Sequence, residues 1–167
     1  DYDAPIAIPS VLTKFKLTKH MDLRLSYAYG FRSPTLQELY FSFHNDNHDI
    51  DGNPDLKAEY SHNITGSVAY RVLHSEKIHL TTTLSGFYND FRDKISLAQN
   101  VDIPNYNTYY NIDRYKTVGG SLENSLSWGG LRANLNVSLI GRYNRYATGD
   151  KSMPRFRYSP EVSTSIS

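Results

Sequence analysis

The 167-residue sequence contains no cysteine, which excludes a disulfide framework and a zinc site built from thiolates. It has no apolar run near the ~18 residues that a membrane-spanning helix needs. Lysine and arginine number 18 against 17 aspartate and glutamate residues, and no basic patch of the kind that binds nucleic acid stands out. Gly-rich phosphate loops, nucleophile elbows and HExxH motifs are also missing. We therefore expect no enzyme, no cofactor and no nucleic-acid partner.

Tyrosine is the residue in excess, with 14 copies against 7 phenylalanines and 1 tryptophan. Its apolar ring and wet hydroxyl suit pleated surfaces, binding loops and membrane interfaces. The chain begins at Asp1 rather than at methionine, and it ends at Ser167 within an alternating run. We interpret residues 1–167 as a fragment of a longer protein.

Apolar and polar residues alternate along most of the chain, as they do in a β-strand with two different faces. In residues 131–143, for example, Leu135, Val137 and Leu139 alternate with asparagine, serine and arginine. No segment has a sustained period of 3.6 residues, and only 35–43 could form a short helix. The alternation predicts about seven strands, at 8–18, 22–30, 60–73, 76–91, 108–128, 131–143 and 156–167.

Short and long connections follow one another without exception in this reading. The tight turns are at 18–21, 73–76 and 128–130, and the long loops are at 31–60, 92–107 and 144–155. An up-and-down sheet then has all its short turns at one end, which is typical of bacterial outer-membrane barrels. The predicted fold is all-β, an antiparallel up-and-down meander that forms part of a transmembrane β-barrel. The alternative is a soluble β-sandwich, in which the same apolar face packs into a core.

Two motifs frame the longest connection. The first is Phe31-Arg32-Ser33-Pro34, followed by Leu36-Gln37-Glu38-Leu39-Tyr40, and the second is Asn53-Pro54-Asp55-Leu56, followed by Glu59. In this order they resemble the boxes of TonB-dependent outer-membrane receptors, which carry a Phe-Arg-Ala-Pro-like box and then an Asn-Pro-Asn/Asp-Leu box. Ser33 is a mild departure from that pattern, a small residue in place of another. The segments 86–97 and 110–128 also resemble strands of the family, so the resemblance covers nearly the whole chain.

The resemblance implies a receptor of the bacterial outer membrane that takes up a scarce nutrient, namely an iron–siderophore complex, haem or cobalamin. Such receptors are coupled to a TonB-type energy-coupling protein through an N-terminal plug, which is absent from these residues. The implied partners are outer-membrane lipid, a small nutrient cargo and, through the missing plug, a TonB-type protein. The alternatives are a β-rich binding or adhesion module and a barrel-type hydrolase, for which the strands offer no catalytic set.

The motif residues also have a local physical interpretation. Pro34 keeps Ser33 out of the helical region, so the strand must end there. Gly52 is free to adopt a positive φ before the chain becomes extended again. Arg32 and Glu59 flank the loop and are candidates for an ion pair. We predict that the motif residues shape the base of the loop rather than contact a ligand: Phe31, Arg32, Pro34, Asn53, Pro54, Leu56 and Glu59.

The loop between the motifs carries the candidate cargo residues. Haem receptors of the family often place a histidine between the two boxes, and imidazole is a common axial ligand of haem iron. His44 and His48 lie there, ~13 Å apart in an extended chain but on one face of a helical turn. The candidate ligand-binding residues are Tyr40, Phe41, Phe43, His44 and His48, and the two histidines are metal ligands only if the cargo is haem. Siderophore and cobalamin receptors have the same boxes.

Overall fold

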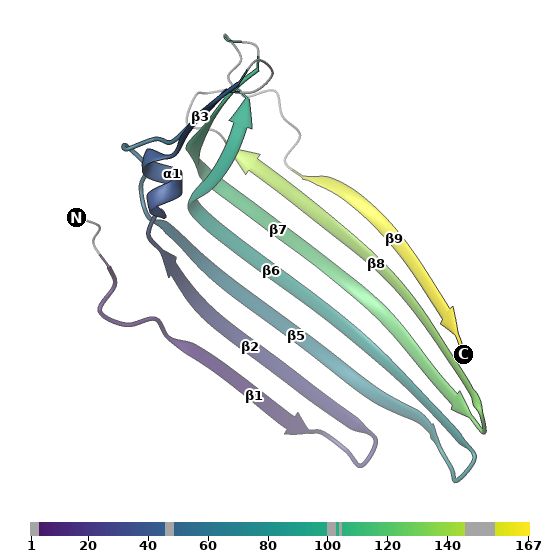
Figure 1. The fold of residues 1–167 in the computed structure, drawn as a ribbon. Coiled ribbons are helices and arrows are strands. Elements are labelled where there is room, and N and C mark those ends of the chain that lie inside the picture. The colour runs from purple at the N-terminus through teal and green to yellow at the C-terminus, as the bar shows by residue number, and fades with distance from the viewer. Residues whose placement is uncertain (1–3, 46–48, 100–102, 104, 146–155) are drawn as a thin grey trace.

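The computed structural model describes residues 4–45, 49–99, 103, 105–145 and 156–167. Most of this part is strand, in one sheet (Figure 1). The long strands among these residues are β1 (Ser10–Lys16), β2 (Met21–Arg32), β5 (Glu59–His74), β6 (Ile78–Gln99), β7 (Tyr106–Trp128), β8 (Leu131–Arg145) and β9 (Arg157–Ile166). Each pairs antiparallel with the next of this set. The predicted meander is therefore confirmed, and the sheet is open at β1 and β9.

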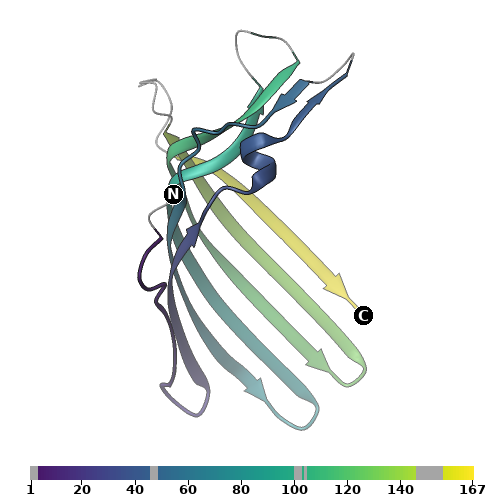
Figure 2. The same ribbon diagram turned by 60° about the vertical axis from the view of Figure 1, so that its left-hand side comes forward.

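The connections differ between the two ends of the sheet, as predicted. Short turns join β1 to β2, β5 to β6 and β7 to β8 at one end, and the long connection from β2 to β5 lies at the other, where β6 and β8 end and β7 and β9 begin (Figure 1). The connection between β2 and β5 contains α1 (Leu36–Tyr40), β3 (Ser42–His44) and β4 (Asp49–Asp51). Figure 2 shows these three elements at the end opposite the short turns. In the described part of the chain, no helix is long and apolar enough to cross a membrane.

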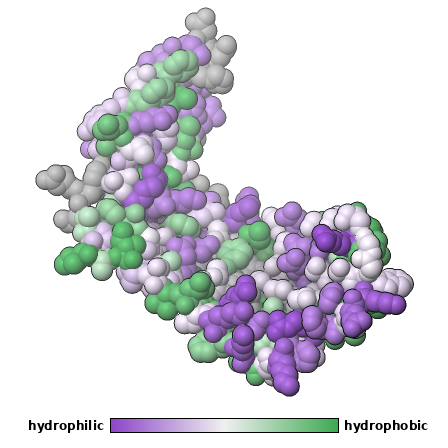
Figure 3. All heavy atoms as spheres, turned by 60° about the horizontal axis from the view of Figure 1, so that its bottom comes forward, coloured by the Kyte–Doolittle hydropathy of each residue, from purple (hydrophilic) through white to green (hydrophobic). Residues whose placement is uncertain are grey.

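One face of the sheet carries a continuous apolar row. The residues of this row lie opposite one another across the long strands: Phe15, Leu23, Val68, Leu84, Leu122, Val137 and Val162. The adjoining row on the other face is polar: Lys14, Arg24, Ser67, Ser85, Ser121, Ser138 and Glu161. Figure 3 shows a largely hydrophilic area at its lower right, with hydrophobic patches among hydrophilic side chains elsewhere in this view.

The apolar row is not covered by a second layer. Leu84 is 60% exposed, and Leu135 and Leu139 are also exposed. A soluble sandwich needs these side chains in a sealed core, so that alternative is wrong for the described residues. An exposed apolar face on a sheet with a polar opposite face is the pattern of a barrel wall between lipid and a wet lumen.

The height of the apolar face fits a bilayer. From Ile78 to Tyr88, β6 rises ~33 Å at ~3.3 Å per residue, and a tilt of ~40° reduces this to the ~25 Å of a lipid-facing band. Trp128 lies opposite Ile78 at the lower limit. Tyr27, Tyr88 and Tyr158 share one cross-strand row at the upper limit. Both rims therefore carry aromatic rings, as expected for the girdles of a barrel.

The predicted loop at 92–107 is wrong in its bounds. β6 continues to Gln99 and β7 begins at Tyr106, so both strands run past the ends of their neighbours. Asp93, with a φ of 52°, adopts the left-handed conformation that aspartate tolerates better than most residues. Pairing resumes with Lys94 opposite Ile112. We call residues 94–99 and 106–112 the β6–β7 extension.

Candidate functional site

The short helix α1 is fixed by the residues at its start. The side chain of Thr35 accepts a hydrogen bond from the amide of Glu38 at 3.2 Å, and the carboxylate of Glu38 accepts one from the amide of Thr35 at 2.8 Å. This reciprocal pair is a capping box, which satisfies amides that a helix start leaves unpaired. Pro34 is buried immediately before it. The chain therefore leaves the wall after Arg32 and turns at once into α1.

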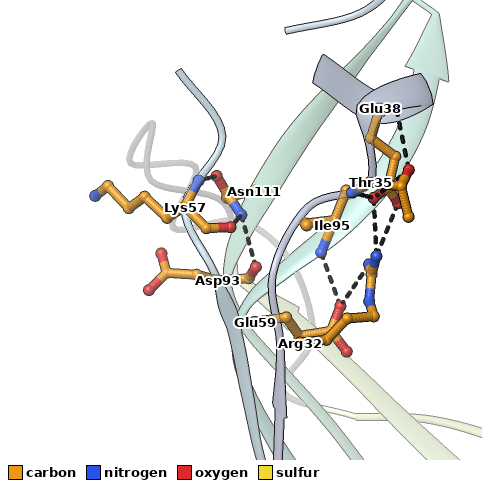
Figure 4. Close-up of polar contacts among 8 residues, drawn as sticks. All are labelled: Arg32, Thr35, Glu38, Lys57, Glu59, Asp93, Ile95 and Asn111. Carbon is orange, nitrogen blue, oxygen red and sulfur yellow. Dashed lines mark hydrogen bonds and ion pairs between the residues drawn. The ribbon is translucent and has the colours of Figure 1, made fainter. Parts of the chain in front are cut away.

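Arg32 joins α1 to β5 (Figure 4). Its Nη1 donates to both carboxylate oxygens of Glu38, at 3.0 and 2.8 Å, and its Nη2 donates to Oε2 of Glu59 at 3.2 Å. The same Oε2 accepts a hydrogen bond from the amide of Ile95 at 3.1 Å. We call Arg32, Thr35, Glu38, Glu59 and the Ile95 amide the Arg32 cluster. The expected ion pair between Arg32 and Glu59 is present, and it also ties the loop base to the β6–β7 extension.

Two asparagine side chains hold the second motif against the same extension. Asn53 donates through Nδ2 to the carbonyl of Tyr109 at 2.9 Å. Asn111 accepts from the amide of Lys57 at 2.8 Å and donates to the carbonyl of Lys57 at 3.1 Å and to that of Asp93 at 2.7 Å (Figure 4). The amide group of Asn111 therefore pairs with the backbone of Lys57 as a neighbouring strand would.

A small apolar core lies under the loop. Leu39 of α1, Leu56 of the second motif and Ile95 of β6 are buried together, and Tyr109 packs against them. Gly52 passes directly beside α1, where an added Cβ would lie 2.6 Å from the carbonyl carbon of Leu39. The φ of Gly52 is not positive, so the predicted reason for this glycine is wrong. It is needed for the close approach of two backbones.

The aromatic candidates at the end of α1 and just beyond it are exposed. Tyr40, Phe41 and Phe43 all face solvent, and the rings of Phe41 and Phe43 stack with centroids 6.4 Å apart and planes at 11°. β3 pairs with β4, and β4 adds in parallel to the start of β7, so a paired hairpin carries these rings. Clustered exposed aromatic rings on a supported element are a feature of binding surfaces.

His44 is held between two carboxylates. Its Nδ1 lies 3.1 Å from Asp49, and its Nε2 lies 3.3 Å from Asp51 and 2.8 Å from the hydroxyl of Ser42. Both ring nitrogens are therefore engaged, and iron ligation would require breaking one of these contacts. Among the residues the structure describes, no group of three or more potential ligands is arranged to hold a metal ion. His48 lies outside the described residues, and the iron-ligand role of both histidines stays a prediction.

Sequence reasoning missed three residues that hold the loop base: Thr35, Glu38 and Asn111. Thr35-x-x-Glu38 is the spacing of a capping box and could have identified the start of α1. The bond from Arg32 to Glu38 depends on where that helix is placed, so spacing alone does not reveal it. Asn111 bonds to Lys57, 54 residues away, and its sequence context gives no sign of that partner.

Glu38 makes the loop base sensitive to acid. Partial burial acts to raise the pKa of Glu38, but hydrogen bonds from the Thr35 amide and from Arg32 outweigh it and place the pKa below the ordinary value of 4.5. A carboxyl group with a lowered folded-state pKa contributes stability that is present above its unfolded pKa and is lost as the pH falls through the folded value. We therefore expect the loop at 33–58 to lose protection from hydrogen exchange below pH 4.5 in the full receptor.

The matched variants for this pH test are Glu38→Gln and Glu76→Gln. Glu38→Gln should remove most of the acid-dependent loss, because the amide does not titrate. Glu76→Gln changes an exposed residue of a short turn and should leave the profile as in the wild type. An unchanged profile in Glu38→Gln would assign the acid sensitivity to another group.

Comparisons with known proteins place this geometry in a family. A family model described as "TonB dependent receptor-like, beta-barrel" matches residues 3–166. "Hemoglobin and hemoglobin-haptoglobin-binding protein C" of Haemophilus influenzae is 30% identical over 141 residues, which cover 79% of this chain and 13% of that protein. "Hemoglobin-haptoglobin-binding protein A" of the same organism is 31% identical over 155 residues, which cover 84% of this chain and 14% of that protein.

A solved structure is also similar. It is a mutant ferric enterobactin receptor of Pseudomonas aeruginosa in complex with enterobactin, with 16% identity and a TM-score of 0.49 over 95% of this chain and 32% of that one. The chain spans only 13% and 14% of the length of the two Haemophilus relatives. Because the family model matches nearly every residue, the chain belongs to the β-barrel family of the TonB-dependent receptors, which are proteins of the bacterial outer membrane.

Proposed function

We propose that residues 1–167 form part of the barrel wall of a larger outer-membrane receptor that takes up haem from a haem protein. One observation carries the proposal: relatives named for binding haemoglobin or haemoglobin–haptoglobin match 79% and 84% of the chain. The proposed activity is transport rather than catalysis. A plug domain outside these residues and a TonB-type protein would supply the energy coupling, and outer-membrane lipid would surround the wall.

The hairpin beyond α1 supplies the proposed cargo surface. The exposed rings of Tyr40 at the end of α1, and of Phe41 and Phe43 at the start of the hairpin, lie at the end of the sheet that faces the medium in this proposal. Aromatic side chains often contribute most of the binding energy at protein interfaces. The Arg32 cluster holds the hairpin in one position before binding, which lowers the ordering cost of association. His44 and His48 are the proposed iron ligands, and His44 would first have to leave its carboxylate partners.

The test uses the full receptor and its binding of haemoglobin. We expect the double variant Phe41→Ala/Phe43→Ala to bind haemoglobin at least tenfold more weakly, because loss of one hot-spot ring costs more than ~1.4 kcal/mol. Leu36→Ala is the matched control, since it truncates a side chain of α1 that is 77% exposed and lies outside the stacked pair. With haemoglobin as the sole iron source, cells with the double variant should grow more slowly than cells with the wild type or Leu36→Ala.

Three outcomes would change the proposal. If the wild-type receptor does not bind haemoglobin but binds a ferric siderophore or cobalamin, the proposed cargo is wrong and that compound takes its place. Wild-type affinity in the aromatic variant would move the cargo surface elsewhere. Unchanged binding of free haem by His44→Ala/His48→Ala would remove the two histidines from iron ligation.

A further inference from the structure

An ion-pair cluster lies next to the upper tyrosine row. Arg114 donates through Nε and Nη2 to the two carboxylate oxygens of Asp90, at 3.1 and 2.7 Å. The Nζ of Lys116 lies 3.4 Å from the same carboxylate and donates to the hydroxyl of Tyr88 at 2.7 Å. Asp90 thereby orients two cations side by side. We call Tyr88, Asp90, Arg114 and Lys116 the outer-face cluster.

The strand register assigns this cluster to the apolar face. Leu84 pairs with Leu122, and Asp90 pairs with Lys116 further along the same two strands. Alternate residues of a strand share a face, so the cluster stands on the side of the apolar row. From Leu84 to Asp90 the strand rises ~20 Å, or ~15 Å along the membrane normal at a tilt of ~40°. That height is where the hydrocarbon ends and the headgroups begin.

Positive charge exceeds negative charge at this height. The two cross-strand pairs above the tyrosine row are Asp90 with Lys116 and Arg92 with Arg114. They contain three cations and one acid. The guanidinium of Arg114 has five N–H donors, and its bonds to Asp90 involve only Nε and Nη2. These two cross-strand pairs therefore carry net positive charge, and Arg114 has N–H groups beyond those bonded to Asp90. Both features suit the binding of an anion.

The apolar face below the cluster is hollowed. Gly66, Gly86 and Gly120 lie in one cross-strand row between the tyrosine row and the apolar row. A hollow of about 400 Å³ is lined there by Leu23, Gly66, Val68, Leu84 and Gly86, together with Ser67 and Ser85. Glycine leaves space that other residues would fill, and the surrounding leucine and valine side chains are apolar. This combination of shape and polarity fits an acyl chain.

We propose that the outer-face cluster binds the phosphate of a lipid in the outer leaflet, with an acyl chain in the hollow below it. Arginine and lysine are the usual donors to phosphate oxygens, and arginine binds them with fixed geometry. Tyrosine rings stand at headgroup level in membrane proteins. Free phosphate would satisfy only the cations, whereas the hollow commits the site to a lipid. The inference rests on the outer-membrane placement in the proposed function.

The test measures binding of fully phosphorylated lipid A to the purified, delipidated full receptor. We expect the double variant Arg114→Gln/Lys116→Gln to bind it at least tenfold more weakly than the wild type. Arg142→Gln is the matched control. Arg142 pairs with Thr117, the neighbour of Lys116 in β7, so this variant removes a cation from the opposite face of the sheet at nearly the same height. Lipid A stripped of its phosphates should bind wild type and double variant equally, and inorganic phosphate should not compete.

A second variant guards against loss of folding. Asp90→Asn keeps both cations and removes the negative charge that competes with phosphate for them, so it should bind the phosphorylated lipid more tightly than the wild type, which a misfolded variant would not do. Equal affinity of the wild type and the double variant for phosphorylated lipid would overturn the site, and competition by inorganic phosphate would overturn the choice of a lipid. Haemoglobin binding is measured on the same samples. If the wild type does not bind haemoglobin, only the proposed cargo is contradicted. If the wild type binds haemoglobin but binds phosphorylated lipid A no more tightly than the double variant, only the lipid site is contradicted.

Discussion

Replacing Leu56 with alanine should release the loop between the two motifs. Leu56 is 3% exposed and packs with Leu39 and Ile95. Truncating a buried leucine typically costs about 2–5 kcal/mol, through lost transfer energy and the cavity left behind. The core under the loop is small, so this loss should affect the whole hairpin. In the full receptor, protection of the amides at 33–58 from hydrogen exchange should fall by roughly two orders of magnitude.

Leu36→Ala is the control for this effect. Leu36 belongs to α1, which packs on Leu56 through Leu39, but Leu36 itself is exposed, and surface truncations usually stay within about 0.5 kcal/mol. Haemoglobin binding should weaken in Leu56→Ala as well, because the aromatic rings are no longer held before binding. If protection in Leu56→Ala equals that in Leu36→Ala, the polar contacts of the Arg32 cluster, rather than the apolar core, hold the loop.

The long strands could be predicted because alternation is a local property. A strand with one lipid-facing side and one wet side shows a period of two without reference to its neighbours. β8 (Leu131–Arg145) was predicted at 131–143, and its apolar row falls on the residues expected. The turns followed from the strands, because each turn is the stretch between the ends of two predicted strands.

Residues 94–99 and 106–107 of the β6–β7 extension were missed because the surroundings of the strands change after Asp93. Ile95 packs under α1 while Leu97 is exposed, so the residues beyond Asp93 no longer divide into a lipid side and a lumen side. Their environment comes from Leu39 and Leu56 in a distant loop. Long-range contacts of this kind leave no periodic trace in the sequence.

The candidate site was predicted only in part, because some of its contacts depend on distant residues. Arg32 and Glu59 end the strands that flank the loop and pair in the register of β2 with β5, so their ion pair could be expected. The contribution of Glu38 required the position of α1. The engagement of His44 by Asp49 and Asp51 required the β3–β4 hairpin, which the short alternating pieces did not reveal.

Leu84 and Ser85 provide the most direct test that this sheet is a wall between lipid and a wet interior. They are neighbours on β6 but lie on opposite faces, at mid-height of the apolar band. In the full receptor folded in lipid vesicles, Leu84→Arg should lower the free energy of unfolding by about 2–4 kcal/mol, the cost of arginine near the middle of a bilayer. Ser85→Arg should change it by less than ~1 kcal/mol. Equal losses in the two variants, or a larger loss in Ser85→Arg, would contradict the assignment of the two faces.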